Sequence, residues 1–272
     1  MSASEDILEI PAPRDGERLA YGSDPYHFGD LRLPVSAGPH PVVIGIHGGY
    51  YRARYGLAYF GHACAALTAL GFATWNIEYR RLGNPGGGWP GTFIDIAAAA
   101  DHLRALAETY PLDLARVVTL GHSAGGHFAC WLAARQRIAA NLPLYTATPL
   151  PIHAAVSLAG VLDLRRAWEL RLSDGVVRQL MGGTPEDYPD RYAAASPSDL
   201  LPLGLPQILI HGTADSNVPY AISADYAAAA QAKGDDVDLV TLEGVGHFEI
   251  VDPRADEWRV VVAAVQRAAG AR

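Results

Sequence analysis

Cysteine, long apolar runs and clusters of basic residues are all scarce in this sequence of 272 residues. The two cysteines, Cys64 and Cys130, lie far apart in alanine-rich stretches, which excludes a disulfide framework and favours two small buried thiols. No apolar run approaches the roughly 20 residues of a membrane span. No H-E-x-x-H or C-x-x-C spacing is present, so neither a metal nor another cofactor is expected.

Positive charge is also in short supply. Lys and Arg total 21 against 29 Asp and Glu, a formal net charge of −8, and no basic run is longer than that in Tyr79-Arg80-Arg81. Nucleic acids and membranes are therefore not expected partners. The first residues carry acidic side chains and no apolar signal-peptide core, so we expect a cytoplasmic protein. A homo-oligomer is compatible with this composition, which leaves the oligomeric state open.

What the sequence does have is apolar material, half of all residues, arranged in alternating strand-like and helix-like segments. Short apolar runs predict buried parallel strands at 42–47, 72–77, 116–121, 152–159, 206–211 and 238–242. Longer segments predict helices at 57–70, 93–109, 124–139, 220–232 and 255–269. An opening antiparallel hairpin is predicted at 17–21 and 29–33. Thr92 and Asp95 resemble a capping box at the start of the second of these helices.

This alternation predicts an α/β protein with a mostly parallel, doubly wound sheet and an antiparallel hairpin on its edge. The rhythm breaks at residues 161–205, which are rich in Arg, Pro and Asp and have short helical pieces around Ala167 and Val177. We interpret this segment as a small cap over the carboxyl edge of the sheet, where open α/β sheets bind their ligands. The chain 1–272 is thus predicted to form a single domain with a cap insertion.

The first chemical motif is Gly121-His122-Ser123-Ala124-Gly125, which fits G-x-S-x-G between a predicted strand and a predicted helix. In that context the serine occupies a tight strand-to-helix turn that lifts its hydroxyl out of the sheet. The bare motif also fits a glycine-rich turn with a capping serine, but the flanking elements favour a nucleophile. His122 and His127 flank this serine, and we interpret both as packing residues.

A serine hydroxyl is a weak nucleophile and requires a base, which in turn requires an orienting acid. Asp215 follows the predicted strand 206–211, and His247 precedes the last predicted helix, so the order is Ser, Asp, His. Each residue alone fits an ordinary turn or surface position. Together, at strand ends and in this order, they predict a catalytic triad of Ser123, Asp215 and His247.

A third motif, His47-Gly48-Gly49-Tyr50-Tyr51, follows the predicted strand 42–47. Acyl transfer requires N–H donors directed at the developing oxyanion, and paired glycines allow a backbone to present its amides in this way. We predict an oxyanion hole formed by the amides of Gly49, Tyr50 and Ala124. The alternative is that the glycines merely turn the chain.

With these three motifs, the sequence resembles the α/β-hydrolase superfamily, in its group of serine esterases and lipases with an H-G-G oxyanion motif. The resemblance runs from about Pro41 to the C-terminus. The run from His47 to Tyr50 is similar to that of kynurenine formamidase, whose motif reads H-G-G-Y-W, but Tyr51 replaces the Trp. The hormone-sensitive-lipase branch reads H-G-G-G, from which Tyr50 departs. The resemblance implies acyl hydrolysis more firmly than it implies a substrate.

Three functions follow as hypotheses. The first is a carboxylesterase that cleaves esters of small or aromatic acyl compounds through an acyl-enzyme, and the second is an arylformamidase that acts on amides of the N-formylkynurenine type. The third is a non-catalytic binding module on a hydrolase scaffold. A partly open pocket for a small-molecule ester or amide is expected under the cap, with Tyr51, Trp89 and Trp168 as candidate lining residues.

Overall fold

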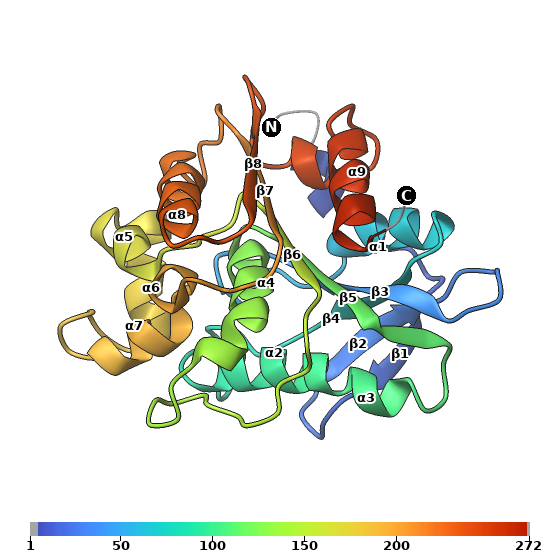
Figure 1. Ribbon diagram of the computed structural model, residues 1–272, viewed down its shortest axis with the longest axis horizontal. Coiled ribbons are helices and arrows are strands. Elements are labelled where there is room, and N and C mark those ends of the chain that lie inside the picture. Colours follow the sequence, from blue (N-terminus) through green and yellow to red (C-terminus); the bar gives the residue numbers. More distant parts are fainter. Residues whose placement is uncertain (1–4, 271–272) are drawn as a thin grey trace.

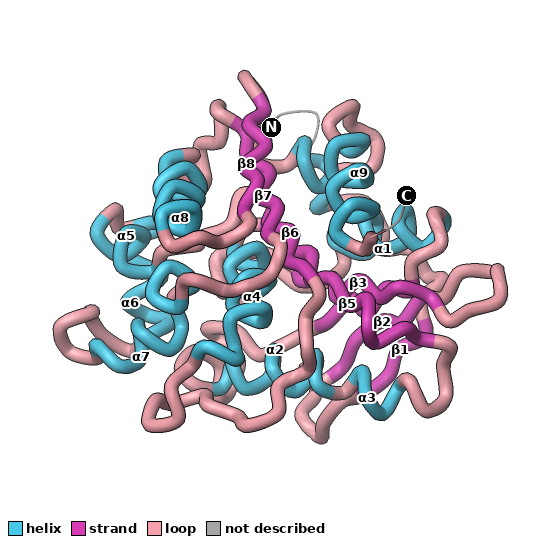
Figure 2. Tube along the Cα trace, in the orientation of Figure 1, coloured by secondary structure: helices cyan, strands magenta, loops and turns pink. Residues whose placement is uncertain are grey.

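The computed structural model describes residues 5–270 of the chain. Its centre is an eight-stranded sheet in the order β1-β2-β4-β3-β5-β6-β7-β8, which runs through the molecule as one twisted layer (Figures 1 and 2). β1 and β2 pair antiparallel, β2 pairs antiparallel with β4, and every later neighbour is parallel. The strands are β1 (Glu17–Ala20), β2 (Phe28–Arg32), β3 (His40–Ile46), β4 (Ala73–Ile77), β5 (Leu112–His122), β6 (Ala154–Leu158), β7 (Gln207–Gly212) and β8 (Val237–Leu242).

Helices cover both faces of this sheet (Figure 1). α1 and α9 lie on one face, and α2, α4 and α8 lie on the other. The bounds are α1 (Phe60–Ala69), α2 (Gly91–Asp101), α3 (Leu103–Leu106), α4 (Ala124–Ala134), α8 (Ala221–Ala232) and α9 (Trp258–Ala268). The architecture is that of the α/β-hydrolase fold, as the resemblance implied, and the mostly parallel sheet with its antiparallel edge confirms the prediction from the alternation of segments.

Two apolar cores follow from the alternation of side chains along each strand. Val43 and Val118 belong to the core beneath α1 and α9, whereas their neighbours Val42 and Val117 belong to the core beneath α2, α4 and α8. Because both faces are covered, the central strands bury consecutive residues, which is why they appear in the sequence as unbroken apolar runs. The carboxyl ends of β3, β5, β7 and β8 meet at one edge, where the chemistry-bearing loops begin.

The segment between β6 and β7 carries three helices of its own at the left of Figure 1. α5 and α6 match the pieces expected around Ala167 and Val177, whereas α7 was not predicted. That helix has a proline in its first turn and only seven residues. It is therefore too short to show a helical period of apolar residues in the sequence. The bounds are α5 (Leu164–Glu169), α6 (Leu172–Met181) and α7 (Pro189–Ala195), followed by a 3-10 turn, η3 (Pro197–Leu200).

Several predicted boundaries differ from the structure. The long helix expected at 93–109 is interrupted at His102, and the one expected at 124–139 ends in a 3-10 turn, η2 (Arg135–Arg137). The capping box is wrong, because α2 begins after Pro90 with no side-chain cap. The Thr92 hydroxyl instead donates to the Arg80 carbonyl at 2.6 Å, and Asp95 pairs with the Arg80 guanidinium. Tertiary partners therefore use both side chains that the motif assigned to the helix end.

Candidate active site

The predicted nucleophile, Ser123, lies at the sharp turn between β5 and α4. Its backbone angles, φ 58° and ψ −121°, lie outside the regions that non-glycine residues favour. A Cβ built on Gly125 would come within 2.0 Å of the Ile46 carbonyl oxygen, and one on Gly121 within 2.0 Å of the Gly125 carbonyl oxygen. The spacing G-x-S-x-G is thus required by backbone contacts on both sides of the serine.

The predicted acid and base form a close pair at the ends of β7 and β8. His247 Nδ1 donates to Asp215 Oδ2 at 2.6 Å, and Asp215 Oδ1 accepts the backbone N–H groups of Asn217 and Val218 at 2.8 and 2.9 Å. Burial alone would raise the pKa of Asp215, but hydrogen bonds from His211 and His247 and the His247 charge lower it below its ordinary value. The carboxylate is therefore ionised at neutral pH and fixes the orientation of His247.

Ser123 and His247 line the same cavity, of about 210 Å³, and both are buried. Within residues 5–270 no hydrogen bond joins the Ser123 hydroxyl to the imidazole. In free enzymes the bond between nucleophile and base is often long and shortens when substrate binds. The arrangement brings together all three residues that the sequence singled out, from three different strand ends.

The loop after β3 lies directly against this serine. Gly49, Tyr50 and Tyr51 have φ of 115°, 52° and 59°, so three successive residues occupy the left-handed region. A Cβ on Gly48 would come within 2.9 Å of Ser123 Cβ, so only glycine allows this approach. In the part of the chain that the structure describes, the backbone N–H groups of Gly49, Tyr50 and Ala124 have no hydrogen-bond acceptor. The predicted oxyanion donors are thus free to bind one.

Side chains hold this loop on both sides. The Gly48 N–H donates to the Tyr59 hydroxyl at 2.7 Å, and the Tyr50 hydroxyl donates to Asn217 Oδ1 at 2.6 Å. The second bond connects the loop to the segment that carries Asp215. Burial and the nearby Asp215 carboxylate raise the pKa of Tyr50 to about 12, so its hydroxyl keeps the proton that it donates.

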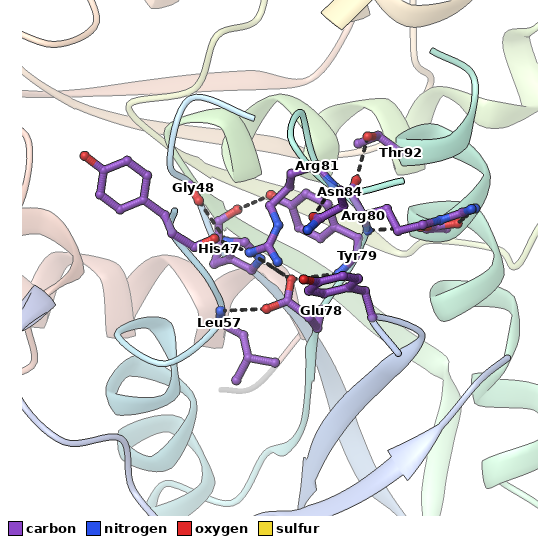
Figure 3. Close-up of polar contacts among 12 residues, drawn as sticks. His47, Gly48, Leu57, Glu78, Tyr79, Arg80, Arg81, Asn84 and Thr92 are labelled. Carbon is purple, nitrogen blue, oxygen red and sulfur yellow. Dashed lines mark hydrogen bonds and ion pairs between the residues drawn. The ribbon is translucent and has the colours of Figure 1, made fainter. Parts of the chain in front are cut away.

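Beneath the loop lies a buried ionic network that sequence reasoning missed (Figure 3). Glu78 Oε1 is 3.0 Å from His47 Nε2 and 3.1 Å from Arg81 Nη1, while its other oxygen accepts the Leu57 N–H at 3.3 Å. The Arg81 guanidinium also donates to the Tyr55 carbonyl. Burial alone would raise the pKa of Glu78, but His47 and Arg81 lower it. This network ties the end of β4 to both ends of the loop 47–57, which follows β3 and contains the predicted oxyanion donors. We call this segment the oxyanion loop.

Replacement of Glu78 by Gln should destabilise the protein by about 3 kcal/mol, because it leaves the Arg81 guanidinium buried without its counter-charge. Since folding lowers the pKa of Glu78, its stabilising contribution is complete above its ordinary value of 4.5 and is lost as the pH falls below it. Urea unfolding at pH 7 and pH 4 measures both effects. We expect Glu78→Gln to lose stability at pH 7 and to show a shallower acid dependence.

The exposed carboxylate Glu17 offers a matched control, and Glu17→Gln should match the wild type at both pH values. An unchanged stability at pH 7 in Glu78→Gln would contradict a supporting role for the network.

Ser123 lines two cavities, and Tyr50 of the oxyanion loop also lines both. The larger one is partly polar and is lined by Glu5, Leu8, Glu9, Gly49, Tyr50, Tyr55, Tyr59, His122, Ser123, Asn217, His247 and Phe248. The smaller one, of about 10 Å³, is apolar and is lined by Tyr50, Tyr51, Ser123, Ala124, Val161, Leu172, Val176 and Val177. The segment between β6 and β7 thus contributes to the smaller pocket through Leu172, Val176 and Val177 of α6.

Of the three residues predicted to line the substrate pocket, one lies beside Ser123 and two do not. Tyr51 lines the smaller pocket, whereas Trp89 and Trp168 line neither cavity that contains Ser123. Trp89 packs on Phe93 at 5.5 Å between ring centroids, and Trp168 lines a separate depression together with residues of α6. Both tryptophans therefore lie outside the two cavities that Ser123 lines.

An N-terminal turn, η1 (Glu5–Leu8), supplies a wall that the sequence did not reveal. The buried side chain of Ile7 and an ion pair between Asp6 and Arg254 attach this turn beside the larger cavity. Four residues carry no periodicity, so no sequence signal identified them.

The two histidines near the nucleophile are buried and neutral, as the packing interpretation expected. Burial lowers the pKa of His127 to about 4, and its Nε2 donates to the Ala195 carbonyl at 2.8 Å. Burial, together with the neighbouring His247, lowers the pKa of His122 to about 3. Among the described residues, no group of three or more His, Cys, Asp or Glu side chains could hold a metal ion.

The BD-FAE family model matches residues 30–229, a range that includes the oxyanion loop, Ser123 and Asp215. The chain belongs to this family. His247 lies beyond the matched range, and its place in the site rests on the geometry above. In residues 5–270, every helix is too short or too polar to cross a membrane.

Individual relatives and solved structures are also similar to this chain. A probable isoprenylcysteine alpha-carbonyl methylesterase from Oryza sativa subsp. japonica is 27% identical over 246 residues, which cover 85% of this chain and 58% of that protein. A truncated carbohydrate esterase from gut microbiota has a TM-score of 0.80 at 22% identity and covers 96% of this chain and 100% of its own. Thermogutta terrifontis esterase 2 with bound butyrate has a TM-score of 0.76 at 22% identity, over 93% of each chain. The two solved structures share the fold of this chain, and the chain spans little more than half the length of the Oryza sativa relative.

Proposed function

We propose that this BD-FAE protein is a serine esterase that hydrolyses carboxylic esters of short acyl groups through an acyl-enzyme intermediate. The observation that carries the proposal is the convergence of Ser123, the Asp215–His247 pair and the free amides of the oxyanion loop on one cavity. Each component has a defined part in acyl transfer, and a binding protein without catalysis would have no use for the combination.

In the proposed reaction, Ser123 Oγ attacks the acyl carbon while His247 Nε2 accepts the hydroxyl proton. The amides of Gly49, Tyr50 and Ala124 bind the oxyanion, and Asp215 stabilises the imidazolium. His247 then gives the proton to the leaving oxygen as the ester bond breaks. Water attacks the acyl-enzyme with His247 again as base, which releases the carboxylic acid and restores Ser123.

The two cavities support a division of the substrate between acyl group and leaving group. The smaller pocket has room for about one water-sized group, which suits the methyl of an acetyl or the hydrogen of a formyl group. We therefore assign it to the acyl side. The larger cavity would take the alcohol, and Glu5 and Glu9 at its wall disfavour a leaving group with negative charge.

A substrate panel tests this proposal. We expect kcat/KM for nitrophenyl acetate to exceed that for the butyrate about tenfold and that for the octanoate by more, since each added methylene must displace cap residues. Val176→Ala enlarges the smaller pocket and should raise the ratio of butyrate to acetate hydrolysis several-fold. Val261→Ala, a buried valine of α9, serves as the control and should leave that ratio unchanged.

The same panel separates the alternatives. The small acyl pocket also accommodates a formyl group, and the H-G-G-Y run resembles that of formamidases, so an arylformamidase is the second candidate. A kcat/KM for N-formylkynurenine far above that for any ester would favour it. Failure of a fluorophosphonate to label Ser123, with no hydrolysis of any substrate, would favour a binding module.

A further inference from the structure

We propose that His122 is a positioning residue which, together with Tyr59, joins the three catalytic loops through one continuous chain of buried hydrogen bonds. This inference rests on the proposed function. The motif assigns no chemistry to His122, since it occupies the variable position of G-x-S-x-G. Nevertheless the residue is only 1% exposed, and both ring nitrogens have partners in loops distant from it in sequence.

This series of hydrogen bonds begins in the oxyanion loop and ends at the proposed catalytic base, His247. The Gly48 N–H donates to the Tyr59 hydroxyl at 2.7 Å, and that hydroxyl lies 3.0 Å from His122 Nδ1. His122 Nε2 lies 2.9 Å from the backbone carbonyl of His247. His122 itself immediately precedes Ser123, so the chain connects oxyanion donors, nucleophile and base.

The direction of each bond follows from its two ends. A backbone N–H only donates and a backbone carbonyl only accepts. The Tyr59 hydroxyl must therefore donate to Nδ1, and His122 must carry its single proton on Nε2. The lowered pKa of His122, about 3, keeps the ring in this neutral form throughout the working range of an esterase. A protonated ring would have no lone pair for Tyr59.

The chain also fixes the position of the base by contact. The rings of His122 and His247 lie 4.5 Å apart between centroids, and the His122 ring stands edge-on to Tyr59 at 5.8 Å. A shift of the oxyanion loop relative to His247 would break at least one of these buried hydrogen bonds. His122 thus holds the amides of the loop and the imidazole of His247 at a set separation, as transition-state binding requires.

A double-mutant cycle tests the chain. Tyr59→Phe and His122→Phe should each lower kcat for nitrophenyl acetate 10- to 100-fold with KM within about threefold. The double variant should be no slower than the slower single variant, because either change already breaks the chain. Tyr226→Phe, which removes another buried hydroxyl with a single partner, should retain the wild-type kcat. Losses that multiply in the double variant, or a wild-type kcat in folded Tyr59→Phe, would overturn the proposal.

A second measurement is independent of catalysis. Nitrogen NMR of the imidazole rings should show His122 protonated on Nε2 alone between pH 5 and pH 8. A ring protonated on Nδ1, or one that titrates in this range, would overturn the proposal even in an active enzyme. If the protein hydrolysed no ester but His122 showed the expected tautomer, the series of hydrogen bonds would stand and the proposed function would fail.

Discussion

Ser123→Ala should lower kcat for nitrophenyl acetate by at least about 10⁴-fold, since removal of the nucleophile leaves only the oxyanion amides and substrate binding. The change removes one oxygen from a buried turn whose backbone is fixed by Gly121 and Gly125, so the fold should persist. Turnover measured alongside thermal unfolding separates the two effects. We expect a melting temperature near that of the wild type and no labelling by a fluorophosphonate.

Ser157 provides the control for this experiment. It is buried in β6, and its hydroxyl has no hydrogen-bond partner among the described residues. Ser157→Ala should hydrolyse esters at the wild-type rate and label normally. If Ser123→Ala instead kept more than about a tenth of the wild-type kcat, another group would be the nucleophile.

Asp215→Asn is the second change with a large expected effect. Asparagine keeps the shape of the aspartate, but its amide group can donate to His247 Nδ1. That contact favours the tautomer in which Nδ1 carries no proton. The substitution also removes the negative charge that stabilises the imidazolium. In a serine protease the equivalent change lowers kcat about 10⁴-fold, and we expect a loss of similar order here. Steady-state kinetics at pH 7 measures it.

The pH dependence of stability provides a second readout for Asp215. Because folding lowers the pKa of Asp215, the stability that its ionised form contributes is complete above its ordinary value of 3.8 and is lost as the pH falls below it. Asp215→Asn should therefore unfold with a weaker dependence on acid than the wild type. Asp235→Asn changes another buried carboxylate, which accepts the Leu203 and Gly204 N–H groups. It should reduce stability but not kcat, whereas an equal loss of kcat would indicate general damage.

These two predictions concern residues that the sequence alone had already selected. Ser123, Asp215 and His247 were identifiable because each lies where a parallel strand ends, and because their order along the chain is that of an α/β-hydrolase. Parallel strands end at a common edge, so residues distant in sequence meet there. The glycines in the motifs around Ser123 and His47 were equally predictable, since turns this tight leave no space for a side chain.

The contacts that support the oxyanion loop could not be predicted from the sequence. Glu78 and Arg81 appear in the sequence as ordinary charges after a strand, and only the packing of β4 beside β3 brings them under the oxyanion loop. The capping box failed for the same reason, because Arg80 binds Asp95 across the fold. Local pattern cannot show which distant partner will take a polar side chain.

The sequence by itself determined the fold class, the strand and helix order, and the three residues of the proposed triad, because strand and helix periods and strand-end motifs are local properties. Only the tertiary structure decided the shape of the site. It divided the space beside Ser123 into a small apolar pocket and a larger, partly polar one, placed Glu5 and Leu8 in the wall, and left Trp89 and Trp168 outside both. Those outcomes depend on how loops from opposite ends of the chain pack together.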